Sequence, residues 1–166
     1  MNYELKRLSI LDGMDIYEML NEIPEEEEGF ENSANGKSFE EFKNYLMSSN
    51  NIFQGIGLKE GWVKSSTFWL YIDGKPVGVG KLRHSLVDHL YKIGGHGGYS
   101  VRPSKRGNGY GNLLLQLLLV EAKKLNIDKI LLTVRNNNEK SIKVALRNNG
   151  IIEKITEERH YIWINT

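Results

Sequence analysis

One stretch of the chain decides the fold prediction, and it reads Val101-Arg102-Pro103-Ser104-Lys105-Arg106-Gly107-Asn108-Gly109-Tyr110-Gly111. A β-like segment precedes it and a leucine-rich segment follows, which predicts a strand, a glycine loop and the start of a helix. The three glycines leave backbone N–H groups uncovered, and the helix behind them adds the positive end of its dipole. Arg102, Lys105 and Arg106 add positive charge. The stretch therefore predicts a site for an anionic group, and a pyrophosphate fits it best.

Two common phosphate loops do not match this stretch. A Walker A loop requires a lysine directly after its last glycine, whereas Asn112 follows Gly111. The dinucleotide fingerprint requires G-x-G-x-x-G and an acidic residue at the end of the next strand. The spacing here is one residue shorter, and the next strand-like run ends on Arg135. The Walker A interpretation fails, and a nicotinamide dinucleotide is disfavoured.

A third pattern fits, since Arg106-x-x-Gly109-x-Gly111 resembles the acyl-CoA loop of the GNAT superfamily of N-acetyltransferases. A second block follows in register, with Asn138-x-x-Ser141-Ile142 on a predicted helix that ends near 149–150. The run 94–103 is similar to a bacterial subgroup of this family whose substrate is unassigned. The resemblance is specific over residues 66–155 and weak over the first 60.

The order of predicted elements favours an α/β fold. We expect a hairpin over 67–86, followed by alternating strands and helices that form a mixed, mostly antiparallel sheet. The resemblance implies that its fourth and fifth strands, 96–101 and 130–134, splay apart to admit the cofactor. Upstream we expect a helix capped by Asp12, a loop over 24–29, and a helix over 39–47 that begins with a capping box of Ser38 and Glu41. About four helices would then flank the sheet.

The length of 166 residues suits one domain. Within this single domain, the resemblance implies acceptor-side helices and loops over 1–65 and an acetyl-CoA-binding core over 66–155. The absence of cysteine excludes disulfides, Cys-ligated metal and a cysteine nucleophile, and favours a cytoplasmic location. No N-terminal run resembles a signal peptide, and the densest apolar run, 113–120, is far shorter than the ~20 residues of a membrane span. We expect no metal site and no membrane partner.

Charge is distributed unevenly along the chain. Residues 1–60 carry 13 acids and 5 bases, a net charge of −8, and residues 61–166 carry 8 acids and 17 bases, a net charge of +9. One interpretation is chance combined with solvated faces. The other is an anionic ligand on the C-terminal half and a cationic amine drawn to the N-terminal half, with Glu25 to Glu28 at the acceptor site.

The resemblance implies acetyl transfer from acetyl-CoA to a primary amine of a small molecule or peptide, by direct attack. It implies that the backbone of Tyr99 and Val101 pairs with the pantetheine arm, and that Asn138 and Ser141 reach it. An alternative role for Asn138 is to cap its helix. The expected pyrophosphate contacts are Arg106, Gly107, Asn108, Gly109, Tyr110, Gly111 and Asn112.

The catalytic acid and base depart from the family pattern. A tyrosine often follows the asparagine by seven residues as the acid, but Ala145 stands there; the substitutes by type are Tyr99, Tyr110 and Tyr161, or water. Many relatives carry a glutamate base where this chain has Gly95. His96, one position along, is a candidate base with a suitable ordinary pKa, and His84 is the second. The alternative is that His96 is packed in the sheet and bonded to backbone.

Two other classes of function stay open. One is a catalytically silent acyl-CoA-binding or sensing module, favoured by Gly95 and Ala145. The other is an anion or nucleic-acid binder, which is weakened because no aromatic residues interleave with the basic ones. The sequence does not name the acceptor amine, and a homodimer is neither required nor excluded.

Overall fold

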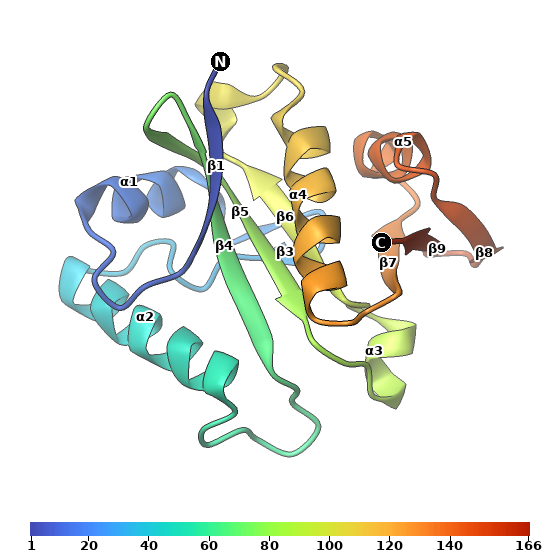
Figure 1. Cartoon of the computed structure of the whole chain (residues 1–166), viewed down its shortest axis with the longest axis horizontal. Coiled ribbons are helices and arrows are strands. Elements are labelled where there is room, and N and C mark those ends of the chain that lie inside the picture. Colours follow the sequence, from blue (N-terminus) through green and yellow to red (C-terminus); the bar gives the residue numbers. More distant parts are fainter.

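The computed structural model describes residues 1–166, which form antiparallel sheets of four, three and two strands together with five α-helices (Figure 1). The strands are β1 (Tyr3–Arg7), β2 (Glu26–Glu27), β3 (Phe30–Glu31), β4 (Ser65–Ile72), β5 (Lys75–Arg83), β6 (Gly97–Val101), β7 (Lys129–Arg135), β8 (Ile151–Ile155) and β9 (Arg159–Asn165). The helices are α1 (Met14–Glu22), α2 (Phe39–Gln54), α3 (Asp88–Lys92), α4 (Tyr110–Lys124) and α5 (Glu139–Arg147). A short 3₁₀ turn spans Pro103–Lys105.

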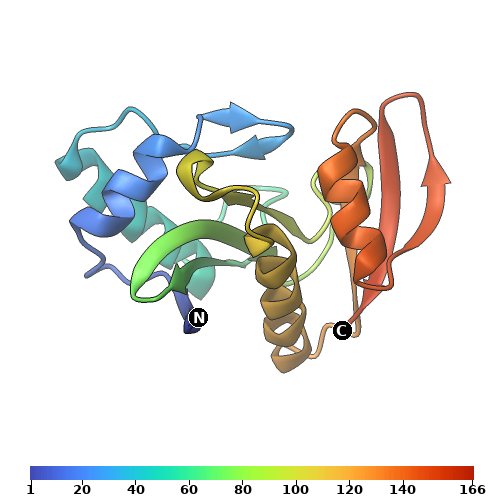
Figure 2. The same cartoon turned by 90° about the horizontal axis from the view of Figure 1, so that it is seen from above.

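The larger sheet has the strand order β1-β4-β5-β6, and every pair in it is antiparallel. Because side chains alternate along a strand, each strand serves both faces. Trp69 and Val79 pack against α1 and α2, whereas Phe68 and Leu70 belong to the core on the α4 face. The sheet is therefore the middle layer between α1 and α2 on one side and α4 on the other (Figures 1 and 2).

Strands β7, β8 and β9 form a separate sheet in the order β7-β9-β8, with α5 beside it. No ladder joins β6 to β7, so the predicted splay of the fourth and fifth strands is confirmed, and it separates the four-stranded sheet from the three-stranded one. One backbone hydrogen bond links the segment before β6 to β7, from His96 N–H to the Leu131 carbonyl at 2.9 Å.

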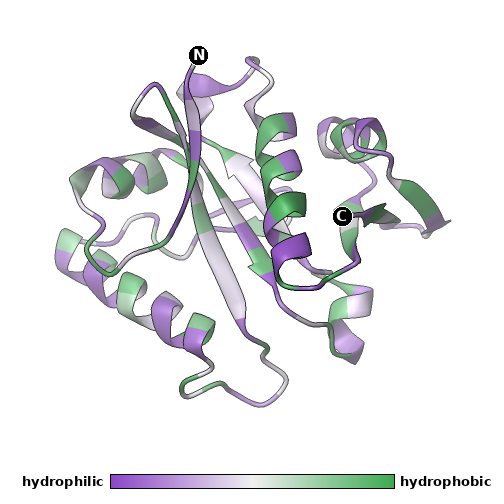
Figure 3. Ribbon diagram, viewed as in Figure 1, coloured by the Kyte–Doolittle hydropathy of each residue, from purple (hydrophilic) through white to green (hydrophobic).

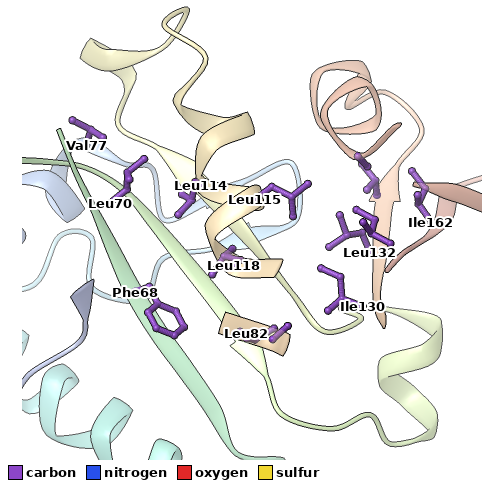
Figure 4. Packing of buried hydrophobic residues seen from close by; sticks show 14 of the residues in the cluster. Phe68, Leu70, Val77, Leu82, Leu114, Leu115, Leu118, Ile130, Leu132 and Ile162 are labelled. Atoms are coloured by element: carbon purple, nitrogen blue, oxygen red, sulfur yellow. The ribbon is translucent and has the colours of Figure 1, made fainter. Parts of the chain in front are cut away.

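Helix α4 fills the wedge between the two sheets. Leu114, Leu115 and Leu118 are buried, and they contact side chains of β4 and β5 on one side and of β7 and β9 on the other (Figure 4). Hydrophobic colour covers most of the helix and gives way to hydrophilic colour at its last turn, where Lys123 and Lys124 lie (Figure 3). The leucine-rich run is thus a helix whose buried residues lie between the sheets, while Gln116 and Val120 stay exposed. None of the helices has the length and apolar composition of a membrane-spanning segment.

The N-terminal third differs from the sequence prediction in several elements. The capping box of Ser38 and Glu41 is confirmed, and α2 continues to Gln54. Asp12 does not cap α1, because its carboxylate accepts hydrogen bonds from Ser9 N–H and Trp69 Nε1–H instead. The predicted loop 24–29 contains the strand β2, which forms a small hairpin with β3. A further helix, α3, makes the total five rather than about four.

Candidate active site

The glycine loop is held in a left-handed conformation. Gly107 and Gly109 have φ of +83° and +78°, and a Cβ built at either position would meet nothing within 4 Å. Glycine is therefore required by backbone conformation and not by crowding. Gly109 is the N-cap of α4 and provides no side chain to cap it. The loop thus opens the first turn of α4 to a ligand.

None of the backbone N–H groups of residues 107–112 donates a hydrogen bond within the protein. Three of these donors belong to the first turn of α4, where an uncapped helix concentrates positive partial charge. The Asn108 side chain turns back, and its Nδ2 donates to the carbonyls of Lys105 and Arg106, at 3.1 Å each. The loop is fixed in place while six amide donors stay available to an anionic group.

A cleft of about 1070 Å³ lies beside this loop, between β6 on one side and β7 and α5 on the other. It brings together all the predicted site residues except His96 and Asn108. Those that line it are Tyr99, Val101, Arg106, Gly107, Gly109, Tyr110, Gly111, Asn112, Asn138 and Ser141. Hairpin β2–β3 lines the same cleft and extends from α1 toward the C-terminal sheet (Figure 2).

Residues of β6 and α5 meet across the cleft. The Tyr99 hydroxyl lies 3.5 Å from Ser141 Oγ, and burial raises the pKa of Tyr99, although its hydrogen bond to Ser141 lowers it in part. Asn138 caps α5, because its Oδ1 accepts from Ser141 N–H at 3.2 Å. The capping role of Asn138 is observed, and its side chain also lines the cleft.

The arrangement of strand, glycine loop, helix and splayed cleft agrees with the sequence match. A model of the acetyltransferase (GNAT) family matches residues 15–151, most of the chain. The protein belongs to the GNAT family. It is therefore an acetyl-CoA-dependent N-acetyltransferase, and the free amides and the cleft are suited to that co-substrate. A search with the sequence finds no match among proteins of curated function.

Solved structures of acetyltransferases share the fold at low sequence identity. The N-acetyltransferase PseH of Campylobacter jejuni aligns with a TM-score of 0.63 and 13% identity over 99% of this chain and 98% of its own, and it is also known in complex with acetyl coenzyme A. Mutant forms of the spermidine/spermine N-acetyltransferase SpeG of Vibrio cholerae align with a TM-score of 0.63 and 16% identity, over 99% of this chain and 95% of their own. The GNAT domain of PAT from S. lividans aligns with a TM-score of 0.67 and 11% identity, over 98% of this chain and 89% of its own.

The Arg106 side chain, a predicted pyrophosphate contact, lines the cleft and is hydrogen-bonded within the protein. Its guanidinium forms two hydrogen bonds to the Glu27 carboxylate, at 2.9 and 2.5 Å, and its Nε donates to the Val101 carbonyl at 2.9 Å. The ion pair fastens the hairpin to the loop. The backbone of Val101, expected to pair with the pantetheine arm, thus already accepts one hydrogen bond at its carbonyl.

His96 is placed differently from the expected base. It is 7% exposed and does not line the cleft, and its Nδ1 accepts a hydrogen bond from Leu131 N–H at 2.8 Å. Its second ring nitrogen therefore carries the proton in the neutral form. Burial, with a smaller contribution from Arg83, lowers the pKa of His96 to about 4. A base needs a free lone pair that faces its substrate, so the geometry opposes this role and matches the alternative of a packed, backbone-bonded histidine.

His84, the second predicted base, lies outside the cleft, whereas His89 lines it. His84 Nε2 lies 2.8 Å from Ser66 Oγ outside the cleft, so it does not face a substrate there. Only His89, on the short helix α3, lines the cleft, and no motif in the sequence distinguished it. The structure has no cluster of three His, Asp or Glu side chains arranged to hold a metal ion.

The acidic segment 25–28 does not present four free carboxylates. Glu26 forms an ion pair with Arg135 at 3.0 Å, and Glu27 forms one with Arg106. These pairs neutralise two of the four glutamates and attach the hairpin to both sides of the cleft. Glu25 and Glu28 make no ion pair, and Glu28 lines the cleft, so the segment offers two free carboxylates instead of four.

Substitution of His96 tests its structural role. Because the folded-state pKa lies below the ordinary value of 6.5, only the unfolded chain takes up a proton between pH 6.5 and about 4, so this residue reduces stability as pH falls through that window. His96→Asn, which keeps an acceptor for Leu131 N–H, should show a smaller fall in melting temperature between pH 7 and 4.5 than wild type. His96→Ala should lose about 2 kcal/mol at pH 7.

Thermal unfolding over that pH range checks both variants. If His96→Asn keeps the wild-type pH slope while losing catalytic activity at full acetyl-CoA affinity, His96 acts as the base after all.

Proposed function

We propose that the protein acetylates a primary amine of a small molecule or peptide by direct attack on the thioester. The observation that carries this proposal is the set of unpartnered amides at 107–112 beside a cleft that separates β6 from β7. Acetyl-CoA supplies an activated acetyl group, and the loop would hold its pyrophosphate. The expected contacts of Asn138 and Ser141 with the pantetheine arm stay part of the proposal, as does the cytoplasmic location.

Direct attack fits the side chains of the cleft. A covalent intermediate requires a nucleophile beside a base. The serine that is hydrogen-bonded to a histidine, Ser66, lies outside the cleft, and Ser141 has a tyrosine beside it. The attacking group is therefore the acceptor amine, and we propose that water carries its proton away.

We propose that Tyr99 is the general acid that donates a proton to the leaving thiolate of CoA. Its raised pKa keeps the phenol protonated at neutral pH, and its hydroxyl lies in the cleft. Of the other tyrosines considered, Tyr161 donates to the Lys92 carbonyl outside the cleft. Tyr110 also lines the cleft, where its backbone N–H is one of the free amides of 107–112. Its hydroxyl has no hydrogen-bond partner, whereas the Tyr99 hydroxyl lies 3.5 Å from Ser141 Oγ.

Tyr99→Phe removes this hydroxyl and keeps the ring against Gly111. We expect kcat to fall at least about tenfold, at the low end of what general acids contribute, with a much smaller change in the KM of acetyl-CoA. Steady-state kinetics check this, with the exposed Tyr3→Phe as the control. An unchanged kcat would assign Tyr99 to packing alone.

Two substitutions at Gly109 test the phosphate loop. Asn and Asp have the same shape and tolerate left-handed backbone, and Asp is also a good N-cap, so the pair isolates charge. Gly109→Asp should bind acetyl-CoA at least about tenfold more weakly than Gly109→Asn, because its carboxylate would repel the pyrophosphate.

Calorimetry measures the two affinities, and equal values would remove the basis of the proposal. Turnover on polyamines, amino acids, aminoglycosides and peptide N-termini then tests the transfer itself. Binding without turnover on any of them would favour the silent acyl-CoA-binding module.

A further inference from the structure

The cleft has a second compartment on the side away from α4. Val79 of β5 packs toward α1 and α2, and because side chains alternate along a strand, Lys81 and Arg83 face the same side. Gly98 of β6 faces it too, since a Cβ there would lie 3.5 Å from the Phe30 ring. We call this compartment the acceptor chamber; it is lined by Phe30, Lys81, Arg83, Gly98, Thr133 and Arg159.

The acceptor chamber contains three cations that no carboxylate pairs with. Lys81 Nζ donates to the backbone carbonyl of Glu31 at 2.7 Å. Arg83 donates to the carbonyls of Gly94 and Gly95 at 3.0 and 3.2 Å. None of the three forms a salt bridge, although other lysines and arginines of the chain do.

Arg159 adds a polar atom without a partner. Its Nη1 donates to the Thr133 carbonyl at 3.3 Å, but its Nε is buried and has no hydrogen-bond partner. Arg135 beside it is already paired with Glu26. An unsatisfied buried donor is costly, and an ion bound beside it is one arrangement that would satisfy it.

The electrostatics of these side chains agree with a missing anion. Burial, and then repulsion from Arg83, lower the pKa of Lys81 to about 8, while Glu31 opposes the shift. Burial likewise lowers the pKa of Arg83. The Glu31 side chain is exposed and makes no ion pair with either cation. An anionic group among these cations would form the ion pairs that Glu31 does not form.

We propose that the acceptor amine carries an anionic group, a carboxylate or a phosphate, which Lys81, Arg83 and Arg159 bind in the acceptor chamber. This inference rests on the proposed acetyl transfer, and it replaces the cationic acceptor with a zwitterionic or anionic one. Lys81 stands opposite Gly98 in the ladder, one residue before Tyr99. The bound anion would therefore place the amine on the stretch of β6 where the thioester is expected.

Matched acceptor pairs test the proposal with acetyl-CoA at saturation. An amino acid is compared with its amide, and an amino sugar phosphate with the free amino sugar, so that each pair differs in the anion alone; the two pairs separate carboxylate from phosphate. We expect the anionic member of one pair to have at least about tenfold higher kcat/KM. Lys81→Met should abolish that preference by raising the KM of the anionic member, with the KM of acetyl-CoA unchanged. The exposed Lys75→Met is the control.

Direct binding keeps the inference testable if no acceptor of the panel reacts. Inorganic phosphate or acetate is added to protein saturated with CoA, and the amide resonances of Gly98 and Thr133 are followed. We expect saturable shifts in wild type and in Lys75→Met, and none in Lys81→Met. A preference for neutral amines or polyamines, or shifts that persist in Lys81→Met, would overturn the anion site and leave acetyl transfer intact. Loss of acetyl-CoA binding itself would instead contradict the proposed function.

Discussion

The two larger sheets are joined along the segment before β6, where His96 makes two hydrogen bonds to β7 and Gly94 N–H donates to Thr133 Oγ1 at 2.9 Å. His96 N–H donates to the Leu131 carbonyl, and the His96 ring accepts a hydrogen bond from Leu131 N–H. The backbone and side chain of His96 together therefore satisfy both backbone hydrogen-bonding groups of Leu131 in β7. Beyond that point β6 and β7 make no ladder, and the leucines of α4 occupy the space between the sheets. A full ladder would close the cleft, whereas these few hydrogen bonds join its two walls at one end and leave it open beyond that point. The neutral, buried histidine is suited to this position because a protonated ring would lose its acceptor.

The uneven charge of the sequence has a third explanation that neither interpretation included. Acids of the N-terminal half form ion pairs with bases of the C-terminal half, in Glu22–Arg102, Glu26–Arg135 and Glu27–Arg106. Glu22 also accepts a hydrogen bond from Ser104 N–H at 2.6 Å, just before the glycine loop. Such partly exposed pairs contribute modestly to stability. Their main effect is to position segments. They attach α1 and the β2–β3 hairpin to the segment that carries the glycine loop, and the hairpin also to the end of β7.

The parts of the fold that could be predicted are those whose cause is local. The glycine loop, the capping box at Ser38 and the end of α5, where Asn149 has φ of +61°, depend on neighbouring residues. The hairpin β2–β3 could not be predicted, because its two-residue strands carry no alternating pattern and its partners, Arg106 and Arg135, are distant in sequence. The place of His96 depends on Leu131, 35 residues away. The cations of the acceptor chamber come from β5 and β9, which only the tertiary fold brings together.

The central claim is that the free amides of 107–112 form the phosphate site, and amide hydrogen exchange measured by NMR tests it most directly. In the protein alone these amides should exchange quickly, since none is hydrogen-bonded. Saturating acetyl-CoA should slow their exchange at least about tenfold, with further protection along β6. Protection elsewhere in the fold, with residues 107–112 still exchanging at their original rates, would contradict the account.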